Sequence, residues 1–431
     1  MRRFHCFMAL TAFTAVLVCA QDISGDWQGT LKAGTQELRT VLHIAKSDNG
    51  DWRATMLSID QSPDRGAGVP ATSFSLDGSN IEFAIGQLRG SYTGKLSADG
   101  TSITGTWTQG RPLPLEFRRP SKETAWLDPS PHSAQFISSE NNVKLEVLDW
   151  GGSGRPLVLL AGLGNTAHIF DKFAPKLSAT YHVYGITRRG FGASSAPLPS
   201  GDATYSADRL GDDILAVLDA LKLNRPVLAG HSLGGEELSS VASRHPERVA
   251  GLIYLDAGYA YAYYDRSRGD LGIDLIDLQK KLQQLRPGKG PQDPKHLIEE
   301  LLATALPGFE RDLKEMLKNL PEAPPGQPAQ PQVPPITQAI LAGMQKYADI
   351  RVPVLAIYAV PHATGQPFKD DAARIAAEAR DEANTGAQAK AFESGVPSAR
   401  VVLLPHANHY VFFSNEADVL REMNAFLGNL P

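Results

Sequence analysis

The stretch that decides the fold runs from Pro226 to Gly235 and reads Pro-Val-Leu-Ala-Gly-His-Ser-Leu-Gly-Gly. Its apolar first half predicts a short buried strand ending at Gly230, and a helix is expected to start near Glu236. Between them lies Gly-x-Ser-x-Gly, with Ser232 at the centre. A sharp turn from strand to helix holds its central residue in a strained conformation, and only very small neighbours fit beside it. The turn also directs the first amides of the helix toward the serine oxygen, where they can stabilise an anion. We therefore predict a nucleophile; the alternative is a glycine-rich loop with an incidental serine.

Length and composition are those of a soluble globular protein. The chain has 431 residues, enough for two domains or one large one, with 42% hydrophobic and 21% charged residues. Its formal net charge of −5 provides no basic surface for nucleic acid, so no nucleic-acid partner is expected. Nothing in the composition indicates an oligomeric state.

The N-terminus, 1–20, resembles a signal peptide. Two arginines precede an apolar stretch, 7–18, that is too short to span a bilayer, and a small-x-small cleavage pattern follows it. We expect a mature chain that starts at Gln21, is exported to the periplasm or the medium, and has no membrane span. A lipoprotein with Cys19 as the acceptor is a poorer fit. The two cysteines of the chain, Cys6 and Cys19, both lie in this segment, so the mature chain would have no disulfide and no thiolate metal site.

Residues 21–119 predict an antiparallel β accessory domain, closed as a small barrel or stacked as a sandwich. A Gly-x-aromatic phrase recurs around Trp27, Tyr92 and Trp107, which predicts one type of strand used repeatedly with its aromatic side chain inside. This segment resembles lipocalin- and avidin-like barrels, either as a binding cup or as a module without a ligand. Alternating apolar and polar residues place its strands at 38–44, 52–57, 81–85, 91–96, 102–108 and 113–118.

A polar, proline-containing segment, 120–131, is expected to be a linker. From 132 to 431 strands and helices alternate, which predicts a mostly parallel sheet with helices on both faces. An insertion, 258–350, interrupts this alternation with amphipathic helices. The clearest of these helices has leucines spaced four, three, four and three residues apart between Leu271 and Leu285.

From about 143 to 427 the chain resembles the serine-type α/β-hydrolase superfamily, esterase-like with a helical cap. The resemblance rests on the turn at Ser232, a glycine turn at 162–164, an Arg-Gly-Phe-Gly turn at 189–192 and a late histidine. In this superfamily the helical insertion is the cap over the active site. Dehalogenase and epoxide hydrolase relatives carry Asp where this chain has Ser232.

The resemblance implies a role for each of several residues. Ser232 would be the nucleophile, and a histidine would take its proton and later deliver it to the leaving group. His409 fits the base better than His406, because the family's histidine follows a small turn and precedes an apolar residue. The oxyanion hole would be formed by the backbone amides of Leu163 and Leu233.

The orienting acid does not stand in its usual place. The family usually carries it just after the strand 354–358, but the turn 359–363 contains no carboxylate. Some members carry the acid one strand earlier, and there this chain has Asp256, which we predict to be the acid. The alternative is that it braces the turn at the serine. Asp370 and Asp371 are poorer candidates, since both are expected at a helix start.

The remaining predictions concern ligands. Tyr259, Tyr261, Tyr263 and Tyr264 follow Asp256 at the start of the cap and are predicted to line the substrate pocket, with packing inside the cap as the alternative. No metal constellation or cofactor fingerprint is found, and Gly162-x-Gly164 lacks the third glycine of a dinucleotide site. We expect an exported hydrolase of a small or medium carboxylic ester. Cleavage of an amide, lactone or carbon–carbon bond, or a non-catalytic binding role, are the alternatives.

Overall fold

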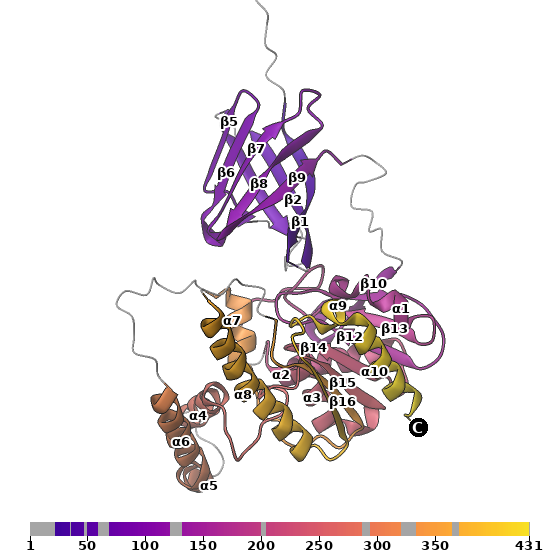
Figure 1. Cartoon of the computed structure of the whole chain (residues 1–431), viewed down its shortest axis with the longest axis vertical. Helices are drawn as coiled ribbons and strands as arrows, with labels where there is room; N and C mark the ends of the chain where they lie inside the picture. The colour runs from indigo at the N-terminus through magenta and orange to yellow at the C-terminus, as the bar shows by residue number, and fades with distance from the viewer. Residues whose placement is uncertain are drawn as a thin grey trace, which may run out of the picture. The chain divides into compact units, whose positions relative to one another are not determined.

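The structure is a computed structural model, which describes residues 22–34, 36–46, 50–58, 69–120, 132–199, 204–286, 294–319, 333–363 and 370–430. They form two compact units, one mainly from residues up to 123 and one mainly from 124–431 (Figure 1). The predicted signal peptide and all but the first residue of the predicted linker lie outside the described residues. The signal peptide stays a prediction, which N-terminal sequencing of the purified protein would test.

The first unit contains one antiparallel sheet with the strand order β4-β3-β2-β1-β9-β8-β7-β6-β5 (Figure 1). The two edge strands of this sheet, β4 and β5, both lie in the segment from Val69 to Asp77, which bends from one edge of the sheet to the other. Its first part pairs with β3 and its second part with β6, and the amides of Ala71 and Thr72 donate to Ala54 and Ala84 between them. The sheet therefore curls toward closure, as predicted for a small barrel. Its strands are β1 (Gly25–Ala33), β2 (Gln36–Lys46), β3 (Trp52–Ser58), β4 (Val69–Pro70), β5 (Ser73–Asp77), β6 (Asn80–Ile85), β7 (Gly90–Leu96), β8 (Ser102–Gln109) and β9 (Arg111–Arg118).

The recurrent aromatic residues fill the interior of this sheet, as the sequence predicted. Trp27, Tyr92 and Trp107 are each at most 1% exposed. The glycines beside them leave room for the rings, because a Cβ at Gly90 would lie 2.1 Å from Trp107 and a Cβ at Gly105 would lie 2.5 Å from the Tyr92 hydroxyl. The likeness to lipocalin- and avidin-like barrels stays a prediction.

The second unit is built on a sheet of eight strands in the order β10-β11-β13-β12-β14-β15-β16-β17. β11 pairs antiparallel with both β10 and β13, and every later pair in this order, from β13 to β17, is parallel. The central strands are buried on both faces and are therefore continuously apolar. The strands are β10 (Ser133–Ser138), β11 (Lys144–Asp149), β12 (Pro156–Leu160), β13 (His182–Ile186), β14 (Val227–His231), β15 (Gly251–Leu255), β16 (Val354–Ala359) and β17 (Ala399–Leu404).

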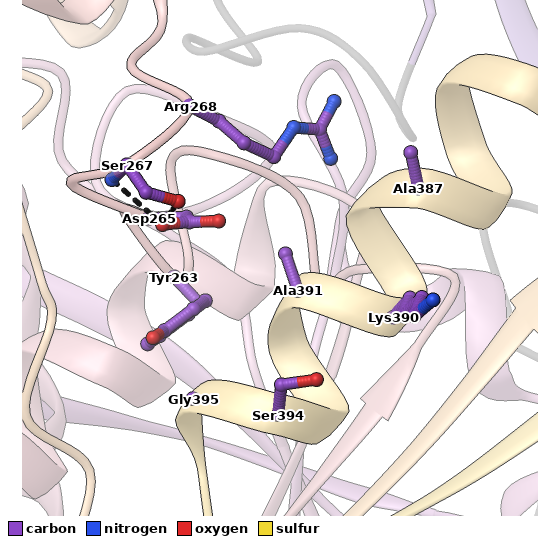
Figure 2. Close-up of a pocket in the computed structure, with 9 residues that line it drawn as sticks. All are labelled: Tyr263, Asp265, Ser267, Arg268, Ala387, Lys390, Ala391, Ser394 and Gly395. Carbon is purple, nitrogen blue, oxygen red and sulfur yellow. Dashed lines mark hydrogen bonds between the residues drawn. The ribbon is translucent and has the colours of Figure 1, made fainter.

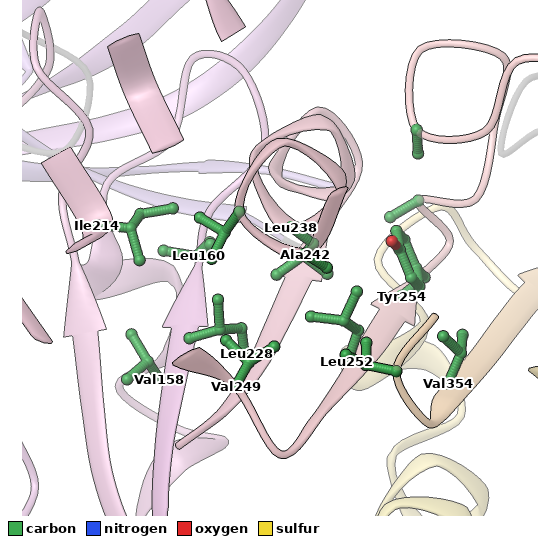
Figure 3. Close-up of a cluster of buried hydrophobic side chains, with 14 of the residues drawn as sticks. Val158, Leu160, Ile214, Leu228, Leu238, Ala242, Val249, Leu252, Tyr254 and Val354 are labelled. Carbon is green, nitrogen blue, oxygen red and sulfur yellow. The ribbon is translucent and has the colours of Figure 1, made fainter. Parts of the chain in front are cut away.

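Helices cover both faces of this sheet, as predicted. On one face α2 (Ala207–Ala220), α3 (Gly234–Arg244) and α8 (Asp371–Gly395) pack against alternate residues of the strands. On the other face α1 (Ala174–Leu177), α9 (Val411–Ser414) and α10 (Glu416–Gly428) pack against the intervening residues. Figure 3 shows part of the first core, made by Val158, Leu160, Ile214, Leu228, Leu238, Ala242, Val249, Leu252, Tyr254 and Val354.

Between β15 and β16 lies the predicted helical insertion. Its helices are α4 (Leu271–Gln284), α5 (Pro294–Glu300), the π-helical turn η6 (Leu301–Ala305), α6 (Leu306–Asn319) and α7 (Pro335–Ala342). The Asp270 side chain accepts from the amide of Ile273 and caps α4, so this helix starts where its leucine spacing begins. No helix among the described residues has the length and apolar character needed to cross a membrane.

The parallel strands determine where a site can form. Ser232 follows β14, Asp256 follows β15, His362 lies three residues after β16, and His409 lies five residues after β17. Because β14 to β17 are parallel neighbours, these four residues emerge at the same edge of the sheet.

Candidate active site

The turn that carries Ser232 has the strained backbone expected from its sequence. Ser232 has φ +49°, in the left-handed region that residues with a side chain rarely adopt. The turn is tight, because the amide of Gly235 donates to the Ser232 carbonyl at 2.8 Å. A Cβ at Gly230 would lie 2.7 Å from the backbone of Gly234, so a larger residue there would force the turn open. The chain therefore presents Ser232 at the start of α3.

Asp256 and His409 are brought together although they are 153 residues apart. The Nδ1 atom of His409 lies 2.6 Å from Oδ2 of Asp256, with the Asp256 side chain 0% exposed and that of His409 39% exposed. An ionised carboxylate only accepts, so Nδ1 of His409 carries the proton of this bond. The Nε2 atom of His409 is then the one left to take a proton from another group.

The carboxylate of Asp256 accepts three further hydrogen bonds. Oδ1 accepts from the Tyr259 hydroxyl at 2.8 Å and from the Ala359 amide at 3.0 Å, and Oδ2 also accepts from Nε2 of His362 at 2.8 Å. Burial alone would raise the pKa of Asp256, but the hydrogen bonds from His362 and His409 outweigh it and lower the pKa to about 2. Asp256 is therefore ionised at any pH near neutrality.

His362 occupies the turn in which the family usually carries its acid, and sequence reasoning did not assign it a role. Its Nδ1 atom lies 2.9 Å from Oδ2 of Asp381 on α8, and its backbone amide donates to the same oxygen at 2.6 Å. The signal that could have found His362 is its place in the turn after β16. Asp381 lies in the middle of a long helix, where no local pattern marks it.

His231, the residue before the serine, holds the His409 loop in place. Its Nε2 atom donates to the His409 carbonyl at 3.1 Å, and the two rings lie 4.7 Å apart. Burial lowers the pKa of His231 to about 3, so the ring is neutral and has a single N–H. Among the described contacts no hydrogen bond joins Ser232 to His409. In hydrolases without substrate this bond is often long and tightens when the substrate binds.

The glycine turn after β12 lies directly against the serine. A Cβ at Gly162 would be 2.9 Å from Nδ1 of His231 and 3.0 Å from Cβ of Ser232. The next residue is Leu163, whose amide was predicted to help stabilise an anion. Leu233 is the N-cap of α3, where a backbone amide has no acceptor inside the helix.

A buried arginine connects these two turns. Arg188 donates to the carbonyl oxygens of Ala161 and Gly162 at 2.7 and 3.3 Å, and it forms a hydrogen-bonded ion pair with Glu237 on α3. Arg188 and Glu237 are both less than 10% exposed. The pair therefore fixes the glycine turn relative to the helix that follows the serine.

Two of the predicted pocket tyrosines, Tyr259 and Tyr261, have different surroundings. Burial raises the pKa of the Tyr261 phenol, and the side chain of Ser232 acts on this pKa in the lowering direction. Tyr259 instead donates to Asp256, so its hydroxyl is used within the site.

None of the weaker candidates has a described side-chain hydrogen bond or ion pair with Ser232, Asp256 or His409. His406 is exposed, and Asp370 caps α8 by accepting from the amide of Ala373. Asp371 has a side chain that is 91% exposed. A separate pocket of about 410 Å³ lies between the 263–268 segment and α8 (Figure 2). Tyr263 is among its lining residues, whereas Ser232, Asp256 and His409 are not.

Two groups of histidine and aspartate side chains bring nitrogen and oxygen atoms within 4.8 Å of one another: Asp256 with His362 and His409, and His132 with His168 and Asp171. We assign neither group to a metal. Asp256 already accepts four hydrogen bonds, and Asp171 lies 3.0 and 3.1 Å from the Nδ1 atoms of its two histidines. Protons account for the described contacts of both groups.

Comparison with known proteins identifies the family. A sequence model of the α/β hydrolase fold matches residues 155–416, which is more than half of the chain and includes Ser232, Asp256 and His409. The chain belongs to the α/β hydrolase fold family.

Individual relatives of this α/β hydrolase have varied activities. The pimeloyl-[acyl-carrier protein] methyl ester esterase of Aeromonas hydrophila is 26% identical over 64% of this chain and 97% of its own length. The fluoroacetate dehalogenase of a Burkholderia species is 34% identical, over 27% of this chain and 38% of its own length. Other relatives match over only 26% to 41% of their length. Among solved structures, a hydrolase from Pseudomonas aeruginosa PA01 is 21% identical with a TM-score of 0.44, covering 69% of this chain and 98% of that one.

Proposed function

We propose that this α/β hydrolase cleaves carboxylic esters through an acyl-enzyme on Ser232, with His409 as the base and Asp256 as the orienting acid. The observation that carries the proposal is the 2.6 Å contact between Asp256 Oδ2 and His409 Nδ1, beside a serine in a strained strand-to-helix turn. It fixes the tautomer of His409 and leaves Nε2 as the proton acceptor. The chain order Ser, Asp, His is also that of the family.

The reaction follows from these roles. The Ser232 oxygen attacks the ester carbonyl while its proton passes to Nε2 of His409, and the new oxyanion is stabilised by the amides of Leu163 and Leu233. The intermediate collapses, the carbon–oxygen bond to the alcohol breaks, and His409 gives its proton to the departing oxygen. A water molecule then loses a proton to His409 and attacks the acyl-enzyme, which releases the acid and restores the serine.

The apolar residues around the two predicted oxyanion amides support an ester with an apolar acyl or alcohol part. Leu163 and Leu233, the two predicted oxyanion residues, belong to one apolar cluster with Phe191, Tyr261 and Ile340 of α7. The methyl ester esterase among the relatives is consistent with this substrate class.

The test uses Ser232→Ala. We expect hydrolysis of a short-chain chromogenic ester to fall by more than about 10⁴-fold, since the variant removes the only nucleophile of the proposed reaction. Labelling by a fluorophosphonate probe should be lost as well. Ser267→Ala, at an exposed serine of the cap, is the control and should keep both properties. Substantial turnover by Ser232→Ala would refute the acyl-enzyme.

A further inference from the structure

His362 lies between two carboxylates and contacts each through a different ring nitrogen. Nε2 is 2.8 Å from Oδ2 of Asp256, and Nδ1 is 2.9 Å from Oδ2 of Asp381. A neutral imidazole has one N–H, and ionised carboxylates can only accept. Both contacts can be hydrogen bonds to ionised carboxylates only if His362 is an imidazolium cation.

The electrostatic surroundings agree with this count of protons. Burial alone would lower the pKa of His362, but the hydrogen bonds and charges of Asp256 and Asp381 outweigh it and raise the pKa to about 9. Asp381 itself has a lowered pKa: its burial acts in the raising direction and is outweighed by the hydrogen bonds from His362. The ring therefore carries its charge until the pH rises through about 9.

The titratable groups that face His362 come from four parts of the fold. Asp256 follows β15 and Asp381 lies on α8, and these two supply negative charge. Tyr259 places its hydroxyl 3.3 Å from Nε2 of His362. His409, from the loop after β17, has its ring centroid 6.1 Å away. His362 and His409 both donate to the same oxygen of Asp256.

We propose that His362, held by Asp381, is a positioning residue that sets the charge Asp256 presents to His409, so that His409 is free to act as a base at a lower pH. The inference rests on the proposed function and adds a regulation of its base. Its physical reason is competition at one oxygen. A buried carboxylate next to an imidazole stabilises the protonated ring, and a ring that holds its proton cannot accept one from serine. A second cation on the same oxygen offsets part of that stabilisation.

The first test measures the pH dependence of kcat/KM on a short-chain ester for His362→Gln. The glutamine amide can still donate to Asp256 but has no charge, so His409 should hold its proton more tightly. We expect the acid limb of the profile to move to higher pH by about one unit, the scale of a nearby charge. The plateau at higher pH should stay within about tenfold of the wild type, since the proposed catalytic residues are intact.

Asp381→Asn tests the same idea without changing His362, and it keeps the inference testable if His362→Gln does not fold. Without its second carboxylate His362 loses its proton at lower pH, so the acid limb should move in the same direction by a smaller amount. Asp371→Asn is the matched control, because it removes the same charge from the same helix at a side chain that is 91% exposed. It should leave the limb in place.

A second measurement does not depend on catalysis. NMR titration of the ring nitrogens in Ser232→Ala, with and without His362→Gln, should show that His409 binds its proton more tightly in the double variant. An unchanged acid limb and unchanged His409 titration, with turnover lowered equally at every pH, would mean that His362 only braces its turn and would overturn the inference. If Ser232→Ala keeps its activity, the proposed function fails separately, and the NMR titration still decides whether the two rings are coupled.

Discussion

Replacing Asp256 by asparagine is the most direct perturbation of the proposed site. The carboxylate is buried and each of its oxygens accepts two hydrogen bonds: Oδ1 from Tyr259 and Ala359, Oδ2 from His362 and His409. An asparagine keeps one oxygen and replaces the other by an NH₂ group, which donates. At least two of the four donors therefore lose their acceptor.

The size of the effect depends on how the asparagine amide lies. With NH₂ at the position of Oδ2 it faces the N–H of His409, which must then change tautomer, and a wrong tautomer costs about 10⁴ in kcat. With NH₂ at the position of Oδ1 it faces the Ala359 amide, and His409 keeps its tautomer but loses the charge that stabilises its protonated form. We expect kcat to fall by about 10² to 10⁴.

Stability should fall as well, and this is a consequence of burial. One backbone amide or imidazole left without an acceptor in the interior costs about 1–3 kcal/mol. In a domain of this size that lowers Tm by a few degrees, on the order of 2–4 °C per kcal/mol. Steady-state kinetics on a short-chain ester, with calorimetry on the same preparations, would measure both effects. If Asp256→Asn lowers Tm but keeps kcat within about threefold of the wild type, Asp256 is a structural brace and not the orienting acid.

Two further changes test the surroundings of the site. Gly162→Ala places a methyl group 2.9 Å from Nδ1 of His231 and 3.0 Å from Cβ of Ser232. We expect kcat on the same ester to fall by about 10², the effect of a displacement near 1 Å, with KM little changed. Wild-type kinetics in this variant would show that the turn accommodates the methyl group without moving Ser232. A shortened chain that begins within 121–131 keeps His132, whose side chain is 2% exposed, and should be soluble and active on a small ester, whereas an insoluble or inactive product would show that the β unit is part of the catalytic unit.

The sequence predicted the sheet of the second unit because its signals are local. Continuous apolar runs mark the buried strands, and Gly-x-Ser-x-Gly marks the point where β14 becomes α3. The edge strand β10 was missed for an equally physical reason. Of its six residues only Ile137 is buried, so neither alternation nor an apolar run distinguishes it from a loop.

The candidate site could be predicted only where its residues follow the ends of strands. Ser232, Asp256 and His409 do so, and sequence reasoning named all three. Asp381 contacts His362 from the middle of α8, and this contact depends on how that helix packs against the sheet. No periodicity or spacing in the chain encodes such a contact.

The position of the proposed acid explains why a histidine stands where relatives usually carry a carboxylate. At the end of β15 the side chain of Asp256 is 0% exposed, and an ionised carboxylate without water needs hydrogen-bond donors or a nearby cation. His409 cannot supply the cation at rest, because it must be neutral to act as a base. The turn after β16 lies beside β15 and can reach the same carboxylate, and His362 supplies from there a donor and a charge. Asp381 then balances that charge where the site meets solvent, with its side chain 30% exposed. An acid at this position and a cation in the next turn are thus two parts of one electrostatic arrangement, in which His362 supplies one of the four hydrogen bonds that Asp256 accepts and a positive charge beside it.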